Sequence, residues 1–436
     1  MIRIFVICFT FLASASVALA AAPIQRVVSP GGIEAWLVEE QAIPIISLEI
    51  SFAGGALSDP TGKEGVSNLM TGLLKEGAGD LDAVGFAQAA DAIAARYGFS
   101  SGRESVTVSA AMLVENRDAS IDLLRLALME PRFDEEPVTR VKRQIISGIR
   151  SSETDPNAIA AKAWFEAAFP DDPYGRPTRG TVETVTGLTV GDLNAARERL
   201  LNIGDAHIGV VGAITAEELA PLLDRLLGDL PNRPAGALEP TSFSGPPGVT
   251  VIDLDVPQSV AIFGHGSILR DDPDFIPAFV MNYVLGGGGF ASRLTVEVRE
   301  KRGLSYSVYS YLQPLDRAGL MLGGVATENA SMATSIEVIS AEWARMASEG
   351  ITEEELDKAK RYLTGSYALR FDSNGRIARM LVGLQEAGLP IDYPETRNEL
   401  VEAVTVEDIK RVAARILDPE ALSITVVGRP EGLPTE

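Results

Sequence analysis

The sequence contains very little histidine and cysteine, the side chains that most often bind zinc or act as nucleophiles. Its two histidines, His207 and His265, lie far apart, and each sits in a β-like run. We therefore expect both to be ordinary strand residues and predict no imidazole zinc site. The single cysteine, Cys8, lies in the first apolar run, so disulfides and thiol catalysis are excluded from the rest of the chain. A calcium or magnesium site made of carboxylates alone stays open, although no EF-hand spacing occurs.

Positive charge is also in short supply. The chain has 38 lysine and arginine residues against 60 aspartate and glutamate residues, a formal net charge of -22. Because phosphate binding needs concentrated lysine and arginine, we predict no nucleic-acid partner. A like-charged membrane surface is disfavoured for the same reason. The plain alternative is that the charge serves solubility alone.

Long hydrophobic runs are absent apart from one near the start of the chain. Residues 4–19 are mostly apolar, follow Arg3 and lead into small residues at positions 18–22. This pattern predicts a signal peptide over residues 1–22, cleaved after Ala20 or Ala22, and hence a protein of the periplasm. An uncleaved anchor is the alternative. Since no second run of this kind follows, we predict no membrane insertion of the remaining chain.

The two halves of the chain resemble each other, which indicates an internal duplication. Short matches recur at a nearly constant offset: Asp59-Pro60 as Asp272-Pro273, Glu115-Asn116 as Glu328-Asn329, and Val210-Val211-Gly212 as Val426-Val427-Gly428. The predicted elements agree as well. In the first half, strands are expected at 44–52, 105–112 and 206–211, with helices at 65–75, 83–97, 116–129 and 135–150. In the second half, helices are expected at 331–347 and 353–371 and a strand at 422–427.

These signals predict two domains, over residues 23–230 and 249–436. Residues 231–248, rich in proline and glycine, read as a flexible linker between them. The expected fold class is α+β, with two homologous domains that each carry a mainly antiparallel sheet covered by helices. Two such domains on a hinge would form a clamshell able to enclose a ligand. Rigid packing of the copies without any ligand is the alternative.

Three further segments give the chain a family resemblance. They are LGGGGFASRL at 285–294, REKRGLSY at 299–306, and the loop FPDDPYGRPTRG at 169–180. In their order and spacing, and together with the duplication, they resemble the pitrilysin/insulinase-like family of inverzincin metallopeptidases over nearly the whole mature chain. The resemblance implies two insulinase-like domains, which agrees with the fold class expected from the repeats.

Active members of that family carry a His-x-x-Glu-His helix, in which two histidines bind zinc and the glutamate activates water. The corresponding helix here begins near Gly65 and holds Asn68, Thr71 and Gly72 at the three motif positions. None of these is a zinc ligand or a general base. A further glutamate ligand would fall near Gly148, where no carboxylate stands. The resemblance therefore implies a subunit that binds no cofactor itself and relies on zinc in a partner.

The second domain keeps another part of the chemistry that the resemblance implies. Family members carry an arginine and a tyrosine in the context matched by Arg299 and Tyr306, near the end of a helix and the start of a strand at 305–312. A guanidinium and a phenol can donate hydrogen bonds to a peptide carbonyl, and these bonds strengthen as the oxygen gains charge. On the residues alone, Arg299 could equally be a surface helix end and Tyr306 a half-buried strand aromatic.

Two neighbouring segments are expected to bind substrate. The strand at 305–312, with Ser305 and Ser307, could accept an extended peptide along its edge if that edge is open. The resemblance further implies substrate contact by a flexible glycine loop. Its members are Gly286, Gly287, Gly288 and Gly289. A plain helix-terminating loop is the alternative, and the spacing does not fit a nucleotide-binding loop.

The sequence thus favours the non-catalytic, substrate-binding subunit of a heterodimeric zinc metallopeptidase that degrades small or unfolded peptides. Its expected partner is a homologous subunit with an intact His-x-x-Glu-His helix, and metalloendopeptidase activity is expected only from the pair. The alternative is a pseudoenzyme that binds peptides or scaffolds a complex without peptidase activity.

Overall fold

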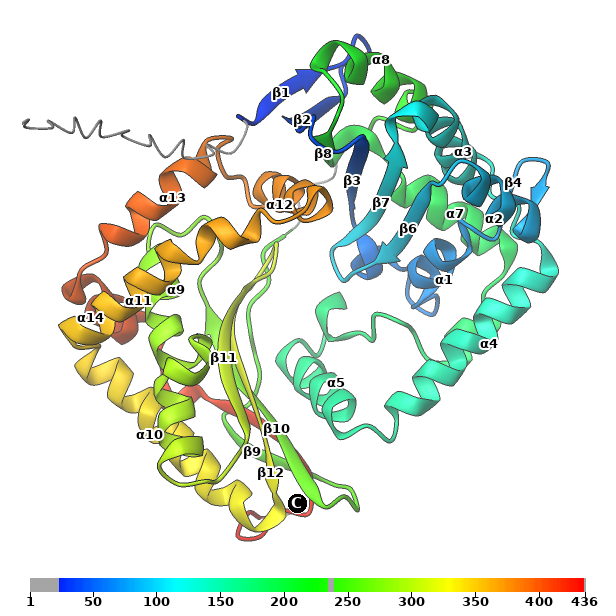
Figure 1. Ribbon diagram of the computed structural model, residues 1–436. Helices are drawn as coiled ribbons and strands as arrows, with labels where there is room; N and C mark the ends of the chain where they lie inside the picture. Colours follow the sequence, from blue (N-terminus) through cyan, green and yellow to red (C-terminus); the bar gives the residue numbers. More distant parts are fainter. Residues whose placement is uncertain (1–22, 234–238, 435–436) are drawn as a thin grey trace, which may run out of the picture.

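The computed structural model describes residues 23–233 and 239–434, which form two halves that are each built on one sheet (Figure 1). The predicted signal peptide, residues 1–22, lies outside the described residues. Within the described ranges, no helix is both long enough and apolar enough to cross a membrane.

The sheet of the first half has six strands in the order β1-β2-β8-β3-β7-β6. All neighbours are antiparallel except β2 and β8, which run parallel. Alternation of buried and partly exposed residues along β7 shows why this segment forms a strand with one face toward the core. The strands are β1 (Gln25–Val28), β2 (Glu34–Glu39), β3 (Ile45–Ala53), β6 (Arg96–Ser101), β7 (Ser105–Leu113) and β8 (Ala206–Gly212).

Most helices of the first half, with the exception of α5, bury their apolar sides against one face of this sheet and form the first core. Several start at side-chain caps, such as the capping boxes of Thr189 and Thr215. A short hairpin, β4 (Gly77–Ala78) and β5 (Leu81–Asp82), lies between α1 and α2. The helices are α1 (Val66–Leu73), α2 (Ala83–Ala92), α3 (Arg117–Met129), α4 (Glu135–Ser152), α5 (Pro156–Ala168), α6 (Val182–Gly187), α7 (Val190–Leu200) and α8 (Ala216–Leu227).

The sheet of the second half repeats the first. Its order is β11-β12-β10-β13-β9, which matches β6-β7-β3-β8-β2 strand for strand, including the single parallel pair, β13 with β9. The duplication predicted from short sequence matches is therefore confirmed. The strands are β9 (Gly248–Asp253), β10 (Gln258–Ser267), β11 (Ser307–Pro314), β12 (Gly319–Glu328) and β13 (Ser423–Gly428).

Helices cover one face of this second sheet and form the second core. They are α9 (Phe275–Asn282), α10 (Met332–Glu349), α11 (Glu353–Gly365), α13 (Tyr393–Glu402) and α14 (Val406–Ile416). Two π-helical stretches, η5 (Tyr283–Gly287) and η7 (Thr295–Glu300), follow α9 and lead to the edge strand β11. The fold class expected from the sequence, two homologous domains with mainly antiparallel sheets and covering helices, is confirmed.

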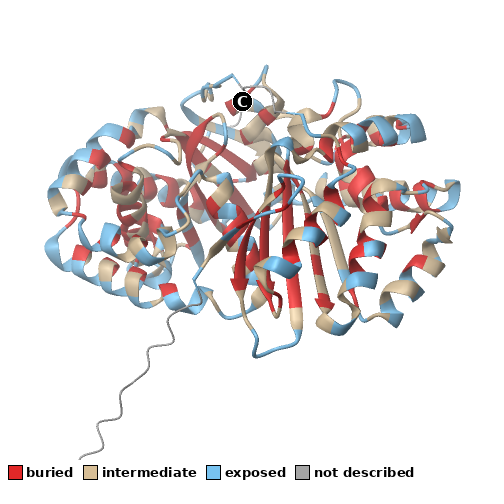
Figure 2. Ribbon diagram, turned by 90° about the horizontal axis from the view of Figure 1, so that it is seen from above, coloured by how far each residue is buried: buried red, intermediate tan, exposed pale blue. Residues whose placement is uncertain are grey.

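One helix from each half lies on the sheet of the other half. Helix α5 contacts β10 and β13, and α12 (Asn374–Glu386) contacts β3 and β8 (Figure 1). Trp164 anchors the first contact and Leu381 the second, each in its own buried apolar cluster. Figure 2 shows the central strands buried between their helical layers. The clamshell is therefore closed by reciprocal packing of its halves.

The connection between the halves is packed over its described part. Phe243 stacks on the Trp164 ring with 5.5 Å between ring centroids. The backbone nitrogen of Ser244 donates to the carbonyl of Ala168 over 2.9 Å. Phe243 and Ser244 thus pack against α5, and the role of residues 231–248 as a linker stays a prediction.

Two predicted helices are shorter than expected. The helix expected at 83–97 ends at Ala92, because Ala94 adopts a left-handed φ of 51° and Tyr97 pairs with Ala110 in the sheet. The helix expected at 353–371 ends at Gly365, and a 3-10 turn, η9 (Tyr367–Arg370), follows it. In both places, tertiary packing overrides a helical sequence pattern.

Candidate functional site

Helix α1 carries the degenerate motif, and its residues serve packing. The hydroxyl of Thr71 donates to the carbonyl oxygens of Ser67 and Asn68, at 3.0 and 3.1 Å. A Cβ added to Gly72 would lie 3.3 Å from Cγ1 of Val141 in α4, closer than ordinary van der Waals contact. Neither position therefore presents a free donor to a metal.

A cation stands where the resemblance places a further zinc ligand. A Cβ built on Gly148 would lie 4.0 Å from Nη1 of Arg179. A guanidinium stays protonated in proteins and repels a metal ion at this range. The positions that hold the zinc ligands and the general base in active members are therefore occupied by residues that cannot bind zinc. These residues are Asn68, Thr71, Gly72 and Gly148. Across residues 23–233 and 239–434, no group of three or more histidine, cysteine, aspartate or glutamate side chains is placed to hold a metal ion.

A buried carboxylate fixes the start of α1. Asp59 accepts hydrogen bonds from the backbone nitrogens of Gly65 and Ser67, at 2.8 and 3.2 Å. Burial raises the pKa of Asp59 to about 6, while these bonds and the Arg199 guanidinium oppose the shift. The helix is thus held in place by polar contacts although its motif has lost the zinc ligands.

Both histidines lie in strands, as predicted. His265 of β10 is buried, its Nε2 accepts a hydrogen bond from Trp343 Nε1 at 2.9 Å, and its Nδ1 lies 2.7 Å from the Gly266 carbonyl oxygen. Burial lowers the pKa of His265, so the neutral ring, with its proton on Nδ1, fits both contacts. His207 lies in β8 and faces the charge of Asp316 in the second half.

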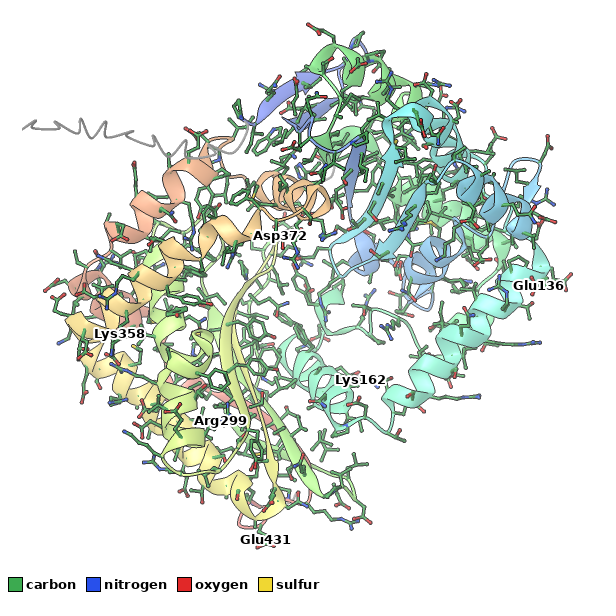
Figure 3. The ribbon with its side chains drawn as sticks, viewed as in Figure 1. Glu136, Lys162, Arg299, Lys358, Asp372 and Glu431 are labelled. Carbon is green, nitrogen blue, oxygen red and sulfur yellow. The ribbon has the colours of Figure 1, made fainter. Side chains whose placement is uncertain are left out.

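Arg299 lies in the last turn of η7 and is not paired with a carboxylate in the described structure. Its guanidinium carbon lies 4.6 Å from the ring centroid of Phe290, a cation–π contact. Phe290 is itself 70% exposed. Figure 3 shows Arg299 in the second half, beside the sheet and away from the α4 helix. The side chain is thus held by an exposed aromatic ring and keeps its donors available.

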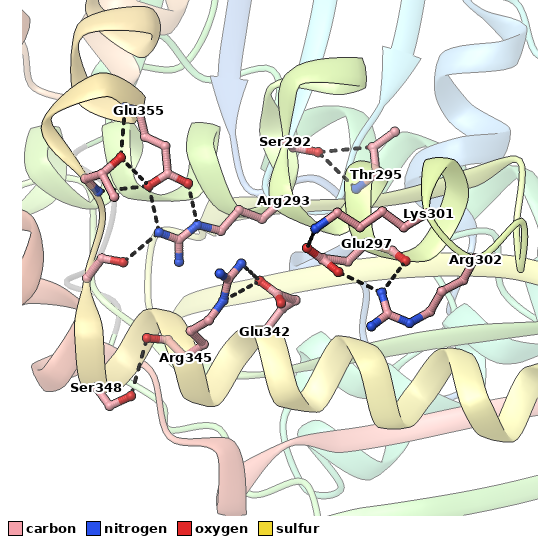
Figure 4. A network of polar contacts seen from close by, with 12 residues as sticks. Ser292, Arg293, Thr295, Glu297, Lys301, Arg302, Glu342, Arg345, Ser348 and Glu355 are labelled. Carbon is pink, nitrogen blue, oxygen red and sulfur yellow. Dashed lines mark hydrogen bonds and ion pairs between the residues drawn. The ribbon is translucent and has the colours of Figure 1, made fainter.

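Glu297, Lys301 and Arg302, which flank Arg299 in the chain, are paired among themselves (Figure 4). Glu297 accepts from Lys301 at 2.6 Å and from Arg302 at 2.7 Å, and these bonds lower its pKa. Arg293 forms a two-pronged pair with Glu355, with both bonds at 2.7 Å. Burial alone would raise the pKa of Glu355, but the bonds from Arg293 and Thr352 hold it at about 2. These pairs occupy Glu297 and Glu355, and in the described structure no carboxylate forms an ion pair with Arg299.

Tyr306 is the most exposed large side chain of this region, with 88% of its surface accessible. It lies in the turn between η7 and β11, where Gly303 ends the helix with a φ of 62°. The alternative that Tyr306 is a half-buried strand aromatic is therefore wrong. Arg299 and Tyr306 flank one short turn of the chain, and no hydrogen bond joins their side chains in the described part of the structure.

Strand β11 forms an edge of the second sheet, since it pairs with β12 alone. Ser305 is buried and pins its start, because its hydroxyl lies 2.7 Å from the Ala326 carbonyl oxygen. Ser307 exposes its side chain. Tyr309 and Tyr311 stack with 6.1 Å between ring centroids and are both partly open to solvent. The edge that the sequence left undecided is thus present, with an aromatic face beside it.

The glycine run ends the helical layer and touches this strand. A Cβ on Gly286 would lie 2.3 Å from Ser310 Oγ, so only glycine permits the close approach of η5 to β11. Asn282 reinforces the contact by donating to the Ser310 carbonyl at 3.2 Å. Gly287 and Gly289 are exposed, and Gly289 has a φ of 56°. A substrate role stays a prediction for the exposed glycines, whereas Gly286 is required by packing.

Sequence reasoning missed a cleft in the first half. It lies between the end of α4, helix α5 and residues 175–181, and has a volume of about 510 Å³. Its charged wall is mostly basic, with Arg103, Lys162, Arg176 and Arg179. Two of these arginines stand in the loop that carried the family resemblance, but the separation in sequence between this loop, the end of α4 and Arg103 in the β6–β7 turn hid the cluster.

The fold and the site together define a duplicated α+β protein of the insulinase-like peptidase kind whose motif helix lacks the metal ligands. Residues 37–182 match the family described as Insulinase (Peptidase family M16), and residues 187–363 match the Peptidase M16 inactive domain. The chain therefore belongs to the insulinase-like M16 peptidase family. Its degenerate motif makes it an inactive, non-catalytic member.

The relatives include proteins named as peptidases and a protein named as a non-peptidase homolog. The non-peptidase homolog YmxG of Helicobacter pylori is 25% identical over 85% of this chain and 86% of its own length. A protein of Mycobacterium leprae named as an uncharacterized zinc protease is 26% identical over 90% of this chain and 89% of its own length. Among solved structures, a peptidase M16 inactive domain from Pseudomonas fluorescens is 26% identical, with a TM-score of 0.88 over 95% of this chain and 99% of that one.

Proposed function

We propose that this chain is the substrate-binding subunit of a two-chain zinc metallopeptidase that degrades small or unfolded peptides. Its partner is a homologous subunit with an intact His-x-x-Glu-His helix, which supplies zinc and the attacking water. This chain supplies Arg299 and Tyr306, which bind the peptide and stabilise the oxyanion. The predicted signal peptide supports export, so the pair works in the periplasm.

One observation carries the proposal: among the described residues, Arg299 and Tyr306 have no hydrogen-bond or ion-pair partner that would occupy their donors. Arg299 rests on Phe290, while Glu297 pairs with the neighbouring cations Lys301 and Arg302. Tyr306 is 88% exposed and so contributes little to the stability of the chain. Exposed aromatic and arginine side chains in one place are typical of binding surfaces.

The chemistry follows from where charge develops. Attack of a metal-activated water turns the peptide carbonyl oxygen into an oxyanion, and donors aimed at that oxygen stabilise the transition state more than the ground state. A guanidinium gives a charge-assisted bond and a phenol gives a neutral one. The edge of β11 supports the same function, since an extended peptide can pair with its main chain next to Tyr306.

A scaffold without turnover is the second candidate. It is favoured by the reciprocal packing of α5 and α12, which holds the two halves together through contacts of the chain itself. The name of the relative from Helicobacter pylori, a non-peptidase homolog, also supports it. In this case Arg299 and Tyr306 would contribute contacts to the complex and no rate.

The test mixes the partner subunit with an excess of this chain, either wild type or the Arg299→Ala variant, so that all of the partner is in complex. It then measures kcat for a short unstructured peptide. Arg361→Ala is the matched control, because Arg361 is exposed on α11 and lies outside the proposed site. We expect kcat to fall about 10²-fold for Arg299→Ala, as for loss of one oxyanion donor, and to stay unchanged for the control. Equal kcat for all three chains, with complex formation intact, contradicts the proposal.

A further inference from the structure

The basic cleft of the first half is the strongest feature that the proposed function leaves unused. Four cations and one carboxylate, Glu153, make up its charged lining. This balance is the reverse of the chain as a whole, which carries a net charge of -22. Local excess of positive charge in an acidic protein concentrates anions at one place.

The four cations differ in what already binds them. Arg103 donates to the Tyr174 carbonyl and stacks on Phe165 at 4.3 Å, so it forms part of the wall. Arg176 makes a long bond, 3.4 Å, to the Asp59 carbonyl, and exposed Lys162 makes a loose 3.7 Å pair with a glutamate one turn along α5. Arg179 is exposed and has no hydrogen bond or ion pair in the described structure. At least Arg179 and Lys162 therefore have free donors.

The loop that carries Arg176 and Arg179 is rigidly seated. A Cβ on Gly65 would lie 2.4 Å from the Arg179 carbonyl oxygen, and one on Gly180 would lie 2.1 Å from that of Glu64. The hydroxyl of Thr184 also donates to the Glu64 carbonyl at 2.9 Å. Such close backbone contact fixes the loop against the start of α1. The backbone that carries the two arginines is therefore fixed at the cleft before any ligand arrives, which lowers the entropic cost of binding.

The cleft also lies beside the degenerate metal position. Nη1 of Arg179 would be 4.0 Å from a Cβ on Gly148, where the family resemblance places a metal-binding carboxylate. The first half thus has a glycine in place of the anionic ligand, and the Arg179 guanidinium lies close to that glycine. The family resemblance places a carboxylate here that would bind a metal ion. In this chain the position faces the Arg179 guanidinium, which has no carboxylate partner in the described structure.

We propose that this cleft binds a carboxylate of a peptide, with Arg179 and Lys162 as the principal donors. The inference rests on the proposed function in one respect, that the chain handles peptides, and it names their chemical class as acidic. A guanidinium fork matches a carboxylate with two parallel bonds, and the lysine adds a point charge. Phe165 in the lining provides apolar surface for the rest of the peptide.

The binding test uses the isolated full chain and calorimetry with three short, otherwise neutral peptides. The first has one glutamate and an amidated C-terminus, the second has glutamine there and a free C-terminal carboxylate, and the third has glutamine and an amide. Binding of the first or second in preference to the third supports the proposal and shows which carboxylate is recognised. Equal affinity for all three overturns it.

A variant pair locates the binding. Arg179→Gln should weaken the preferred peptide by about tenfold, because one charge-assisted contact is lost. Arg361→Gln makes the same charge change on α11, far along the chain from the cleft, and should leave affinity unchanged. Equal weakening by both variants means that the preference is only a long-range charge effect, which also overturns the proposal. Circular dichroism of each variant shows whether it is folded.

These results separate the inference from the proposed function. Peptide binding is measured without the partner subunit, so failure of the two chains to act together leaves the carboxylate preference intact. Conversely, loss of kcat in Arg299→Ala with no carboxylate preference would refute only the cleft.

Discussion

Trp164 of the first half donates a hydrogen bond from its indole Nε1 to the carbonyl oxygen of Ser423 in the second half, over 3.0 Å. The indole is buried between α5 and the second sheet, where it stacks on Phe243. A single side chain thus joins packing and hydrogen bonding across the two halves.

Removing this indole should strongly destabilise the chain. We expect Trp164→Ala to lower the free energy of unfolding by about 3–5 kcal/mol, since a large aromatic side chain leaves a cavity. Trp164→Phe keeps most of the packing and loses the hydrogen bond, so a smaller loss of about 1–2 kcal/mol is expected. Denaturant unfolding followed by circular dichroism measures both. Equal stability of Trp164→Ala and wild type would show that the halves do not depend on this contact.

A buried glutamate at the second cross-contact predicts a pH effect. Glu49 of β3 faces Arg379 and Glu386 of α12, and burial raises its pKa from 4.5 to about 7. The folded state therefore holds this proton more tightly than the unfolded state. Its contribution to stability is complete below about pH 4.5 and is lost as the pH rises through about 7.

Glu49→Gln should remove this dependence. Between about pH 5 and pH 7.5 we expect the wild type to lose on the order of 2 kcal/mol relative to the variant, since one pKa unit corresponds to about 1.4 kcal/mol. The measurement is the difference in free energy of unfolding between the two proteins at each pH. A difference that stays constant over this range is the contrary outcome.

Restoring the sequence motif should not restore a zinc site. Asn68→His, Thr71→Glu and Gly72→His together rebuild the motif, but a side chain at position 72 meets Val141 and the Arg179 guanidinium remains beside Gly148. We expect less than about one tenth of a zinc ion per triple-variant chain after dialysis at neutral pH, because the site would still lack a carboxylate ligand. Elemental analysis gives the ratio, with wild type as the control. One zinc per chain would show that the packing of α1 tolerates the metal.

Tyr306→Phe separates a catalytic subunit from a scaffold. The variant removes one hydroxyl from an exposed side chain, so stability and assembly with the partner should not change. If the phenol donates to the oxyanion, kcat of the pair falls by about 10²-fold while KM changes little. A scaffold predicts an unchanged kcat. Tyr362→Phe is the matched control, because Tyr362 is 59% exposed on α11 and lies outside the proposed site.

The sequence predicted the architecture where signals repeat. Matches such as Asp59 with Asp272 indicated two copies, and both sheets indeed share one strand order. The sequence could not predict that α5 and α12 each pack on the sheet of the other half. Local periodicity shows that a helix has an apolar face, but it does not show which sheet covers that face. The boundary after Ala92 was missed for a related reason, since the pairing of Tyr97 with Ala110 is decided by the sheet.

The candidate site was predictable in part. The loss of zinc ligands at Asn68, Thr71 and Gly72 follows from residue chemistry, and the structure adds the packing role of Thr71 and Gly72. The exposure of Tyr306 could not be read from an alternating pattern, which predicted that the strand starts at Ser305, whereas β11 begins at Ser307. The approach of the Arg179 guanidinium to Gly148 could not be predicted from the sequence, because it joins a loop and a helix that are distant in sequence.

The central claim is that the partner subunit supplies zinc and this chain supplies the oxyanion donors. Its most direct test compares peptide hydrolysis by the isolated chain, by its His-x-x-Glu-His partner and by their equimolar mixture. Our account predicts no turnover by the isolated chain and a mixture much faster than the partner alone, because the oxyanion donors and the zinc lie on different subunits. Hydrolysis by the isolated chain, or a mixture no faster than the partner alone, would contradict it.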